Sequence, residues 1–292
     1  MPEDQVDGEE SYPNIGAADR DVVLASLRAI GEQIDDEIDV AEAALLLAAL
    51  DRRGESLDPY RDILAEIAAE ARRTTARTHS VEMQIAALTD LLAARWKFRG
   101  DSETYDDPRN ANLIDVVERR RGLPVAIGIL WLHAGRAYGA DITGLAFPSH
   151  FLLRLSARGQ RVIIDPFHGG KLLGAEDLRR MIKDAHGGEK EIEPGHYAPV
   201  GNRDVLIRLQ NNLKLRAIAA DNFERALEIL VSMTAIAPRR SELWWETAVL
   251  HSRLGNMKTA IAVLEAYLAD SSGDHRRAEI EDLLRRLRAR VN

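Results

Sequence analysis

Two residues in the middle of the chain, His150 and Asp165, have side chains suited to acid–base chemistry. An imidazole accepts a proton near neutral pH, and a carboxylate beside it can hold its tautomer. A predicted turn at Ala157-Arg158-Gly159 joins two short strands into a hairpin. This turn places His150 opposite residues 165–167, at the open end of the hairpin. The sequence does not fix how the two strands pair to within one residue. A shift of one residue in this pairing decides whether the two side chains share a face.

An apolar helix is predicted just before this hairpin. Val125 to Tyr138 has almost no polar face, Pro124 suits its first position and Gly139 suits its end. In an acyl-transfer site of the order Cys-His-Asp, the start of such a helix supplies the nucleophile, aided by the helix dipole. Here the helix starts with proline, and the 292 residues include no cysteine. Thiolate chemistry is therefore excluded for this sequence.

The remaining periodicity predicts an α+β fold class. Helical spacing dominates before residue 100 and after residue 195, and three short strands lie between, at 142–147, 150–156 and 160–165. The first residues carry six acidic side chains and no Lys or Arg, which is typical of a disordered tail. The predicted units are an acidic tail at 1–19, a helical N-terminal unit at 20–99, a core with a small antiparallel sheet at 100–195 and a helical segment at 196–292.

The last hundred residues contain an internal repeat. Asp221-Asn222-Phe223 is matched 34 residues later by Gly255-Asn256-Met257. This period resembles the tetratricopeptide repeat, with Arg276 to Val291 predicted as a capping helix. Only two copies are visible, so we expect the helices to dock on the rest of the chain. Pairs of such helices form concave surfaces for peptide segments, which implies a protein or peptide partner.

The central residues also resemble a known family. Asn110, Gly122-Leu123-Pro124, Phe147-Pro148-Ser149-His150-Phe151 and Asp165-Pro166-Phe167 resemble the transglutaminase-like core of the SirB1 family. The Pro-x-His-Phe and Asp-Pro-Phe motifs are the most specific part, and the helical segments on either side fit the same layout. The resemblance implies a papain- or transglutaminase-like core in which His150 and Asp165 match the superfamily's histidine and aspartate. Pro124 stands where thiol members have cysteine, so the resemblance implies a fold rather than a reaction.

Two classes of function remain. The first is a non-catalytic protein-interaction or regulatory scaffold. The second is a slow hydrolase or amidase, in which a His–Asp pair activates water with an expected gain of about 10²–10⁴-fold. A transglutaminase ranks third, because its acyl-thioester needs a thiol. Ser149 is a poor substitute nucleophile, since neighbours on a strand point to opposite faces and His150 is its neighbour.

Several polar residues are candidates for lining a binding cleft: Tyr105, Asn110, Asn112 and Ser149. For the first three, hydrogen bonding of the loop to its own backbone is the competing interpretation. His168 joins His150 and Asp165 as a possible metal ligand, but the short spacing of metal motifs is missing, so we expect no metal. Gly169-Gly170 lacks the lysine of a phosphate-binding loop, and no cofactor is expected.

The composition limits the cellular locations and the kinds of partner that can be expected for this chain. The chain has 39 Lys and Arg against 47 Asp and Glu, a net charge of −8, which argues against nucleic-acid binding. The longest charge-free stretch has 14 residues, shorter than the roughly 18 that a membrane-spanning helix needs. The acidic N-terminus is the opposite of a signal peptide. We therefore expect a cytoplasmic protein with no membrane partner, and the oligomeric state stays open.

Overall fold

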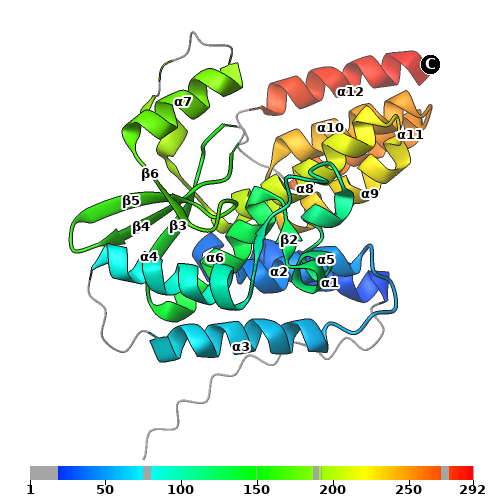
Figure 1. Ribbon diagram of the computed structural model, residues 1–292. Helices are drawn as coiled ribbons and strands as arrows, with labels where there is room; N and C mark the ends of the chain where they lie inside the picture. Colours follow the sequence, from blue (N-terminus) through cyan, green and yellow to red (C-terminus); the bar gives the residue numbers. More distant parts are fainter. Residues whose placement is uncertain are drawn as a thin grey trace, which may run out of the picture.

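The computed structural model describes residues 19–74, 80–148, 150–186, 191, 193–270 and 276–291. These residues form helices packed around one small antiparallel sheet (Figure 1). The predicted acidic tail lies outside the described residues, apart from Asp19, whose side chain accepts a hydrogen bond at the start of the first helix.

The N-terminal region has four helices: α1 (Arg20–Glu32), α2 (Val40–Ala49), α3 (Asp58–Thr74) and α4 (Val81–Thr89). A 3₁₀ turn at Asp35–Glu37 separates the first two, and α4 continues into a π-helical turn at Asp90–Arg95. Ser80 caps α4 by accepting from the Met83 N–H. These helices also pack on later parts of the chain: α1 lies against α9 (Phe223–Ile236) and α3 lies against α6 (Pro124–Tyr138). The N-terminal region therefore shares one large hydrophobic core with α6 and α9, whereas two smaller clusters of buried side chains lie apart from it.

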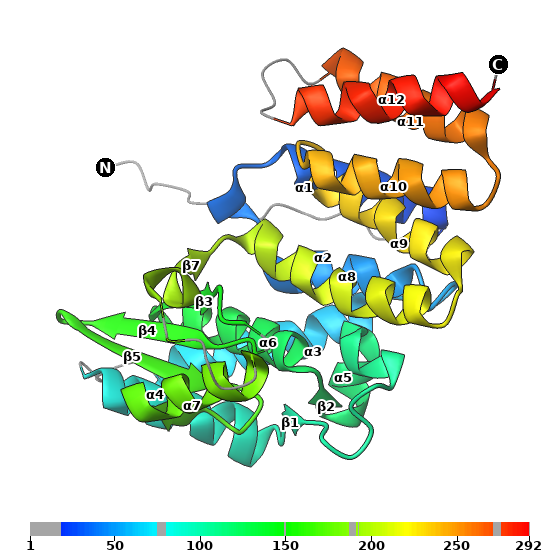
Figure 2. The same cartoon turned by 90° about the horizontal axis from the view of Figure 1, so that it is seen from above.

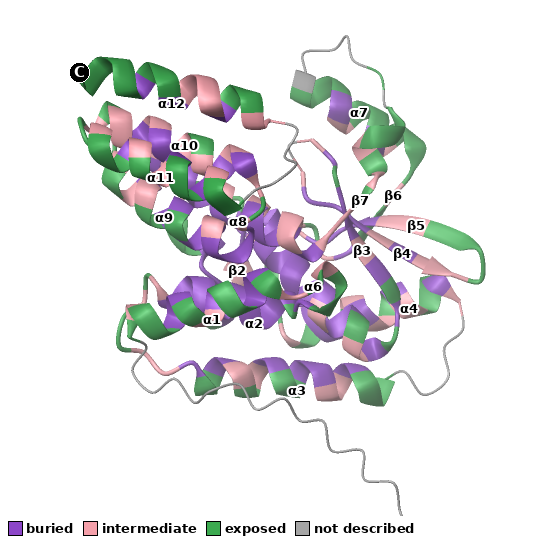
Figure 3. Cartoon of the chain, turned by 180° about the vertical axis from the view of Figure 1, so that it is seen from behind, coloured by how far each residue is buried: buried purple, intermediate pink, exposed green. Residues whose placement is uncertain are grey.

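Helix α6 confirms the prediction of a buried helix. Pro124 is its first residue, and Gly139 ends it with a φ of 83°. It follows a 3₁₀ turn at Pro108–Ala111, α5 (Leu113–Arg119) and a parallel pair of two-residue strands, β1 (Arg99–Gly100) and β2 (Arg121–Gly122). In Figure 3, α2 and α6 are largely buried, whereas α7 and α12 turn exposed faces to solvent.

The main sheet has five strands in the order β6-β5-β4-β3-β7, and all neighbours are antiparallel. The three predicted strands correspond to β3 (Asp141–Leu145), β4 (Leu153–Ala157) and β5 (Gln160–Asp165). The sequence did not predict the short β6 and β7, nor the helix α7, which covers one face of the sheet. Their bounds are Lys171–Leu173, Pro199–Val200 and Ala175–His186.

The hairpin β4–β5 closes as predicted. Arg158 and Gly159 form a two-residue turn in which both have positive φ, 50° and 80°, and this turn type matches the twist of the strands. Leu153 stands opposite Ile164. His150 comes just before β4 and Asp165 ends β5, so both residues lie at the open end of the hairpin.

The C-terminal helices stack side by side, with α12 at the outer end (Figure 2). A 3₁₀ turn at Pro194–Tyr197 precedes them. The helices α9 and α11 begin 34 residues apart, as the repeat predicts, and α12 is the predicted capping helix. Their bounds are α8 (Asn202–Ala219), α9 (Phe223–Ile236), α10 (Ser241–Arg253), α11 (Met257–Asp270) and α12 (Arg277–Val291).

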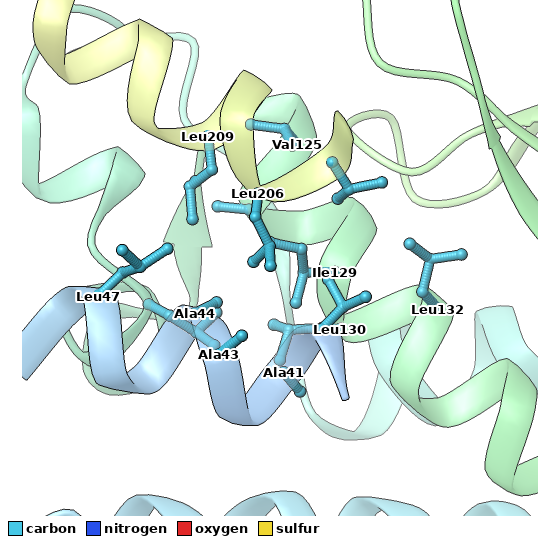
Figure 4. Close-up of a cluster of buried hydrophobic side chains, with 14 of the residues drawn as sticks. Ala41, Ala43, Ala44, Leu47, Val125, Ile129, Leu130, Leu132, Leu206 and Leu209 are labelled. Carbon is cyan, nitrogen blue, oxygen red and sulfur yellow. The ribbon is translucent and has the colours of Figure 1, made fainter. Parts of the chain in front are cut away.

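Helix α8 docks this segment on the core, as expected for a repeat of only two copies. It contacts α2 and α6, and all three helices contribute to one cluster of buried side chains (Figure 4). The cluster includes Leu47 of α2, Ile129 of α6 and Leu206 of α8. The repeat segment and the core are thus held together by apolar packing.

Candidate functional site

The start of α6 lies beside the segment that carries His150. Pro124 is buried at the first helical position, and no side chain caps this helix end. The ring of Phe151 packs on Gly128, one turn further along, so closely that a Cβ there would come within 2.4 Å of the ring. The structure therefore packs the residue after the predicted histidine on α6, one turn after the proline that stands at the predicted nucleophile position.

Asp165 pairs with His168 rather than with His150. The carboxylate is buried, and its Oδ2 lies 2.7 Å from Nδ1 of His168. Its Oδ1 accepts hydrogen bonds from the backbone N–H groups of Phe167 and His168, at 2.9 and 3.4 Å. The side chain thus folds back on the turn that follows β5, in the manner of an Asx turn. That turn geometry, an aspartate three residues before a histidine, is the signal that pattern reading of the sequence missed.

His168 is exposed at the surface, with 59% of its side chain accessible. When Nδ1 donates to Asp165, Nε2 is the basic nitrogen of the neutral ring. The exposed side chain places the ring at the solvent boundary. The pair has the geometry of a general base held by a carboxylate. From the sequence, His168 was expected only as a possible metal ligand.

His150 is half-buried and lies within electrostatic reach of the same groups. Burial lowers the pKa of its imidazole, the charge of Asp165 opposes this, and His168 and Arg208 add to the lowering. A lowered pKa means that the ring is neutral at pH 7. The charge of Asp165 therefore affects the pKa of His150 without a hydrogen bond between them, whereas its carboxylate is bonded to residues 167 and 168.

A residue of the repeat segment holds the His150 loop in place. Nη2 of Arg208, on α8, donates to the backbone carbonyls of Phe147 and His150, at 2.9 and 2.5 Å. Its guanidinium also lies over the ring of Phe151, 5.6 Å from the centroid. Burial lowers the pKa of Arg208, and within the described residues the guanidinium contacts two carbonyls and a ring rather than a carboxylate. Sequence reading missed this contact, because the two segments are about sixty residues apart.

The predicted cleft residues separate into two groups. Asn110 is fully buried and its Nδ2 donates to the Thr104 carbonyl, while Asn112 caps α5 by accepting from two backbone N–H groups. Both side chains therefore hydrogen-bond backbone groups close to them in the chain, which was the alternative to a role in a binding cleft. Tyr105 is exposed, and its ring meets Phe167 edge-on at 6.1 Å. Ser149 lies outside the described residues, and a ligand-binding role for any of the four stays a prediction.

The described part of the chain lacks two other kinds of feature, a metal-binding cluster and a helix that could span a membrane. No group of three or more His, Cys, Asp or Glu side chains there is arranged to hold a metal ion. Within the same residues, none of the helices combines the length and the apolar character needed to cross a bilayer.

Comparison with known families agrees with this architecture. Residues 58–211 match the transglutaminase-like superfamily, and residues 213–285 match the tetratricopeptide repeat. Because the first match spans just over half of the chain, the protein belongs to the transglutaminase-like superfamily. The resemblance to a transglutaminase-like core with a tetratricopeptide-like tail is confirmed, whereas the SirB1 assignment and the predicted domain boundaries stay predictions.

Individual relatives extend from bacteria to mammals. A UPF0162 protein of Xylella fastidiosa is 30% identical over 189 residues, which cover 64% of this chain and 67% of the relative. Human F-box only protein 21 is 29% identical over 144 residues, 46% of this chain and 22% of its own length. Among solved structures, menin aligns over 84% of this chain and 68% of its own, with 12% identity and a TM-score of 0.42. That likeness is too low to bear on the fold or function.

Proposed function

We propose that this protein is a non-catalytic protein-interaction scaffold built on a transglutaminase-like core. The observation that carries the proposal is Pro124, which occupies the start of α6 in a chain without cysteine. A proline side chain cannot form an acyl-enzyme, and loss of the nucleophile from a triad costs several orders of magnitude in rate. The chain keeps the transglutaminase-like fold but lacks the cysteine sulfur that would form the acyl-enzyme.

The repeat segment supports the interaction role. Its helices expose large apolar side chains, with Leu215 of α8 at 61% and Trp245 of α10 at 37% exposure. Helical repeats of this kind use their surfaces to bind protein segments. Because α8 is packed into the common core, a partner bound to the repeat helices would be held rigidly relative to the sheet and the His150 loop.

The proposal predicts partner capture without turnover. The immobilised full chain should retain a reproducible partner from an extract of its own cells, identified by mass spectrometry. The purified chain should release no ammonia from a glutamine-containing peptide, and Pro124→Ala should give the same background rate. Measurable turnover together with failure to retain any partner would contradict the scaffold function.

A slow hydrolase is the second candidate, favoured by the 2.7 Å contact between His168 and Asp165. In this case His168 would remove a proton from the attacking water. The variants His168→Ala and Asp165→Asn should then lose about 10²–10⁴-fold in the rate of amide hydrolysis. His150→Ala is the matched control and should keep the rate. If the wild-type chain shows no hydrolysis, or if His168→Ala retains it with an unchanged circular dichroism spectrum, this candidate is excluded.

A further inference from the structure

A cavity of about 520 Å³ lies where the core meets the repeat segment. One wall comes from α5 and from the polar loop before it, residues 100–112, and the other from α8 and α9. Its size falls in the range of pockets that bind small molecules or inserted side chains. The residues that line the two walls include Asp106, Pro108, Leu213, Ala217, Asn222 and Ile229.

The floor of this cavity is apolar. Leu213 and Ala217 of α8 and Ile229 of α9 each expose less than a tenth of their surface, and Pro108 lies among the lining residues opposite. An apolar group seated on these side chains is removed from water together with the small part of their surface that is still exposed, which is favourable. The floor therefore selects an apolar group.

The charged residues of the cavity already have partners. Among the lining residues, Arg225 donates to Asp51 at 2.5 Å and Arg216 to Asp106 at 3.1 Å. Asp115 and Arg109 pair with residues outside the lining, Arg52 and Asp107, each at 2.7 Å. A charged ligand group would lose its hydration and find no unpaired countercharge among these pairs. Burial raises the pKa of Asp51 and Asp115 in spite of their arginine partners, which agrees with poor hydration of these two carboxylates. The paired charges therefore select a neutral occupant.

From this floor and this charge balance we propose that the cavity receives an uncharged, bulky apolar side chain from a peptide segment of a partner protein. The inference rests on the proposed scaffold function and gives it a site. The exposed Asp106 and Asn222 at the same cavity can hydrogen-bond the peptide backbone on either side of the inserted residue. Leucine, methionine and phenylalanine are the side chains that fit this description.

The first test uses small probes that copy single peptide residues. N-acetyl-leucine amide should shift the methyl resonances of Leu213 and Ile229 saturably in NMR spectra of the full chain, at about millimolar concentration. N-acetyl-lysine amide and N-acetyl-glutamate amide should not shift them. Equal or stronger binding of either charged amide, or no response to the leucine amide, overturns the proposal.

A pair of adjacent variants makes the test specific. Ala220 is exposed at the end of α8 and lines the cavity, so Ala220→Phe should obstruct it and weaken binding of the leucine amide about tenfold or more. Ala219→Phe is the control, because Ala219 is also exposed and is not among the lining residues. Equal weakening in both variants, or in neither, contradicts the assignment.

Failure of this inference can be told apart from failure of the scaffold function. A captured partner that binds the wild-type chain and Ala220→Phe equally well overturns the cavity as its site and leaves the scaffold function intact. A chain that binds the leucine amide but retains no partner contradicts the scaffold function and, with it, a protein as the occupant. Loss of the partner in Ala220→Phe alone supports both proposals.

Discussion

Replacement of Phe151 by alanine is expected to lower the free energy of unfolding by about 3–5 kcal/mol. The ring is 1% exposed and packs on two glycines, Gly128 of α6 and Gly144 of β3. A Cβ at these positions would come within 2.4 and 2.9 Å of the ring. Because neither glycine has a side chain that could move into the space, the alanine variant keeps a cavity between the helix and the sheet.

Urea denaturation followed by circular dichroism measures this loss. Leu172→Ala is the control, because Leu172 in β6 is 51% exposed and its truncation should change the stability by about 0.5 kcal/mol or less. A loss of less than about 1 kcal/mol for Phe151→Ala would mean that the His150 segment is not packed on α6 as the structure describes.

Asp101→Ala is expected to cost about 3–5 kcal/mol, the range found when one partner of a buried ion pair is removed. Asp101 is 2% exposed and accepts from the N–H groups of Glu103 and Thr104, from the Thr104 hydroxyl and from Arg119. Alanine would leave these donors without an acceptor inside the polar loop. Glu103→Ala, which breaks only an exposed pair with Arg121, should cost about 1 kcal/mol or less.

The same carboxylate makes stability depend on pH in the acid range. Burial alone would raise the pKa of Asp101, but hydrogen bonds from Thr104 and the charge of Arg119 outweigh it and lower the pKa to about 2. Because this lies below the value of 3.8 for the free side chain, the unfolded chain binds a proton first as the pH falls. The carboxylate therefore stabilises the fold above about pH 4, and about 2 kcal/mol is lost between pH 4 and 2. Asp101→Ala should lack this part of the acid dependence, and an unchanged profile would contradict the assignment.

Local signals in the sequence were sufficient for the elements that carry the site. Proline and glycine bound α6 because one fits the first helical position and the other a positive φ at the end. Arg158 and Gly159 close the hairpin because a two-residue turn needs that same conformation. The 34-residue repeat predicted where α9 and α11 begin. Each of these features depends on residues that are neighbours in the chain.

The partners of the site residues depend on packing and could not be predicted in this way. Whether Asp165 reaches His150 or His168 is decided by the turn after β5, where the carboxylate binds its own backbone. Arg208 reaches the His150 loop only because α8 packs on α2 and α6. The cavity likewise exists only because the polar loop faces α8 and α9. Hydrophobic periodicity identifies the buried faces of helices, but it does not say which faces meet.

If this transglutaminase-like core forms no acyl-enzyme, intact-mass spectrometry will detect none. The full chain is incubated with an activated ester of a glutamine-containing peptide, quenched in acid and weighed after removal of the peptide. We expect the mass of the unmodified chain at every time point. A mass increased by one acyl group, lost again when hydroxylamine is added, would contradict it.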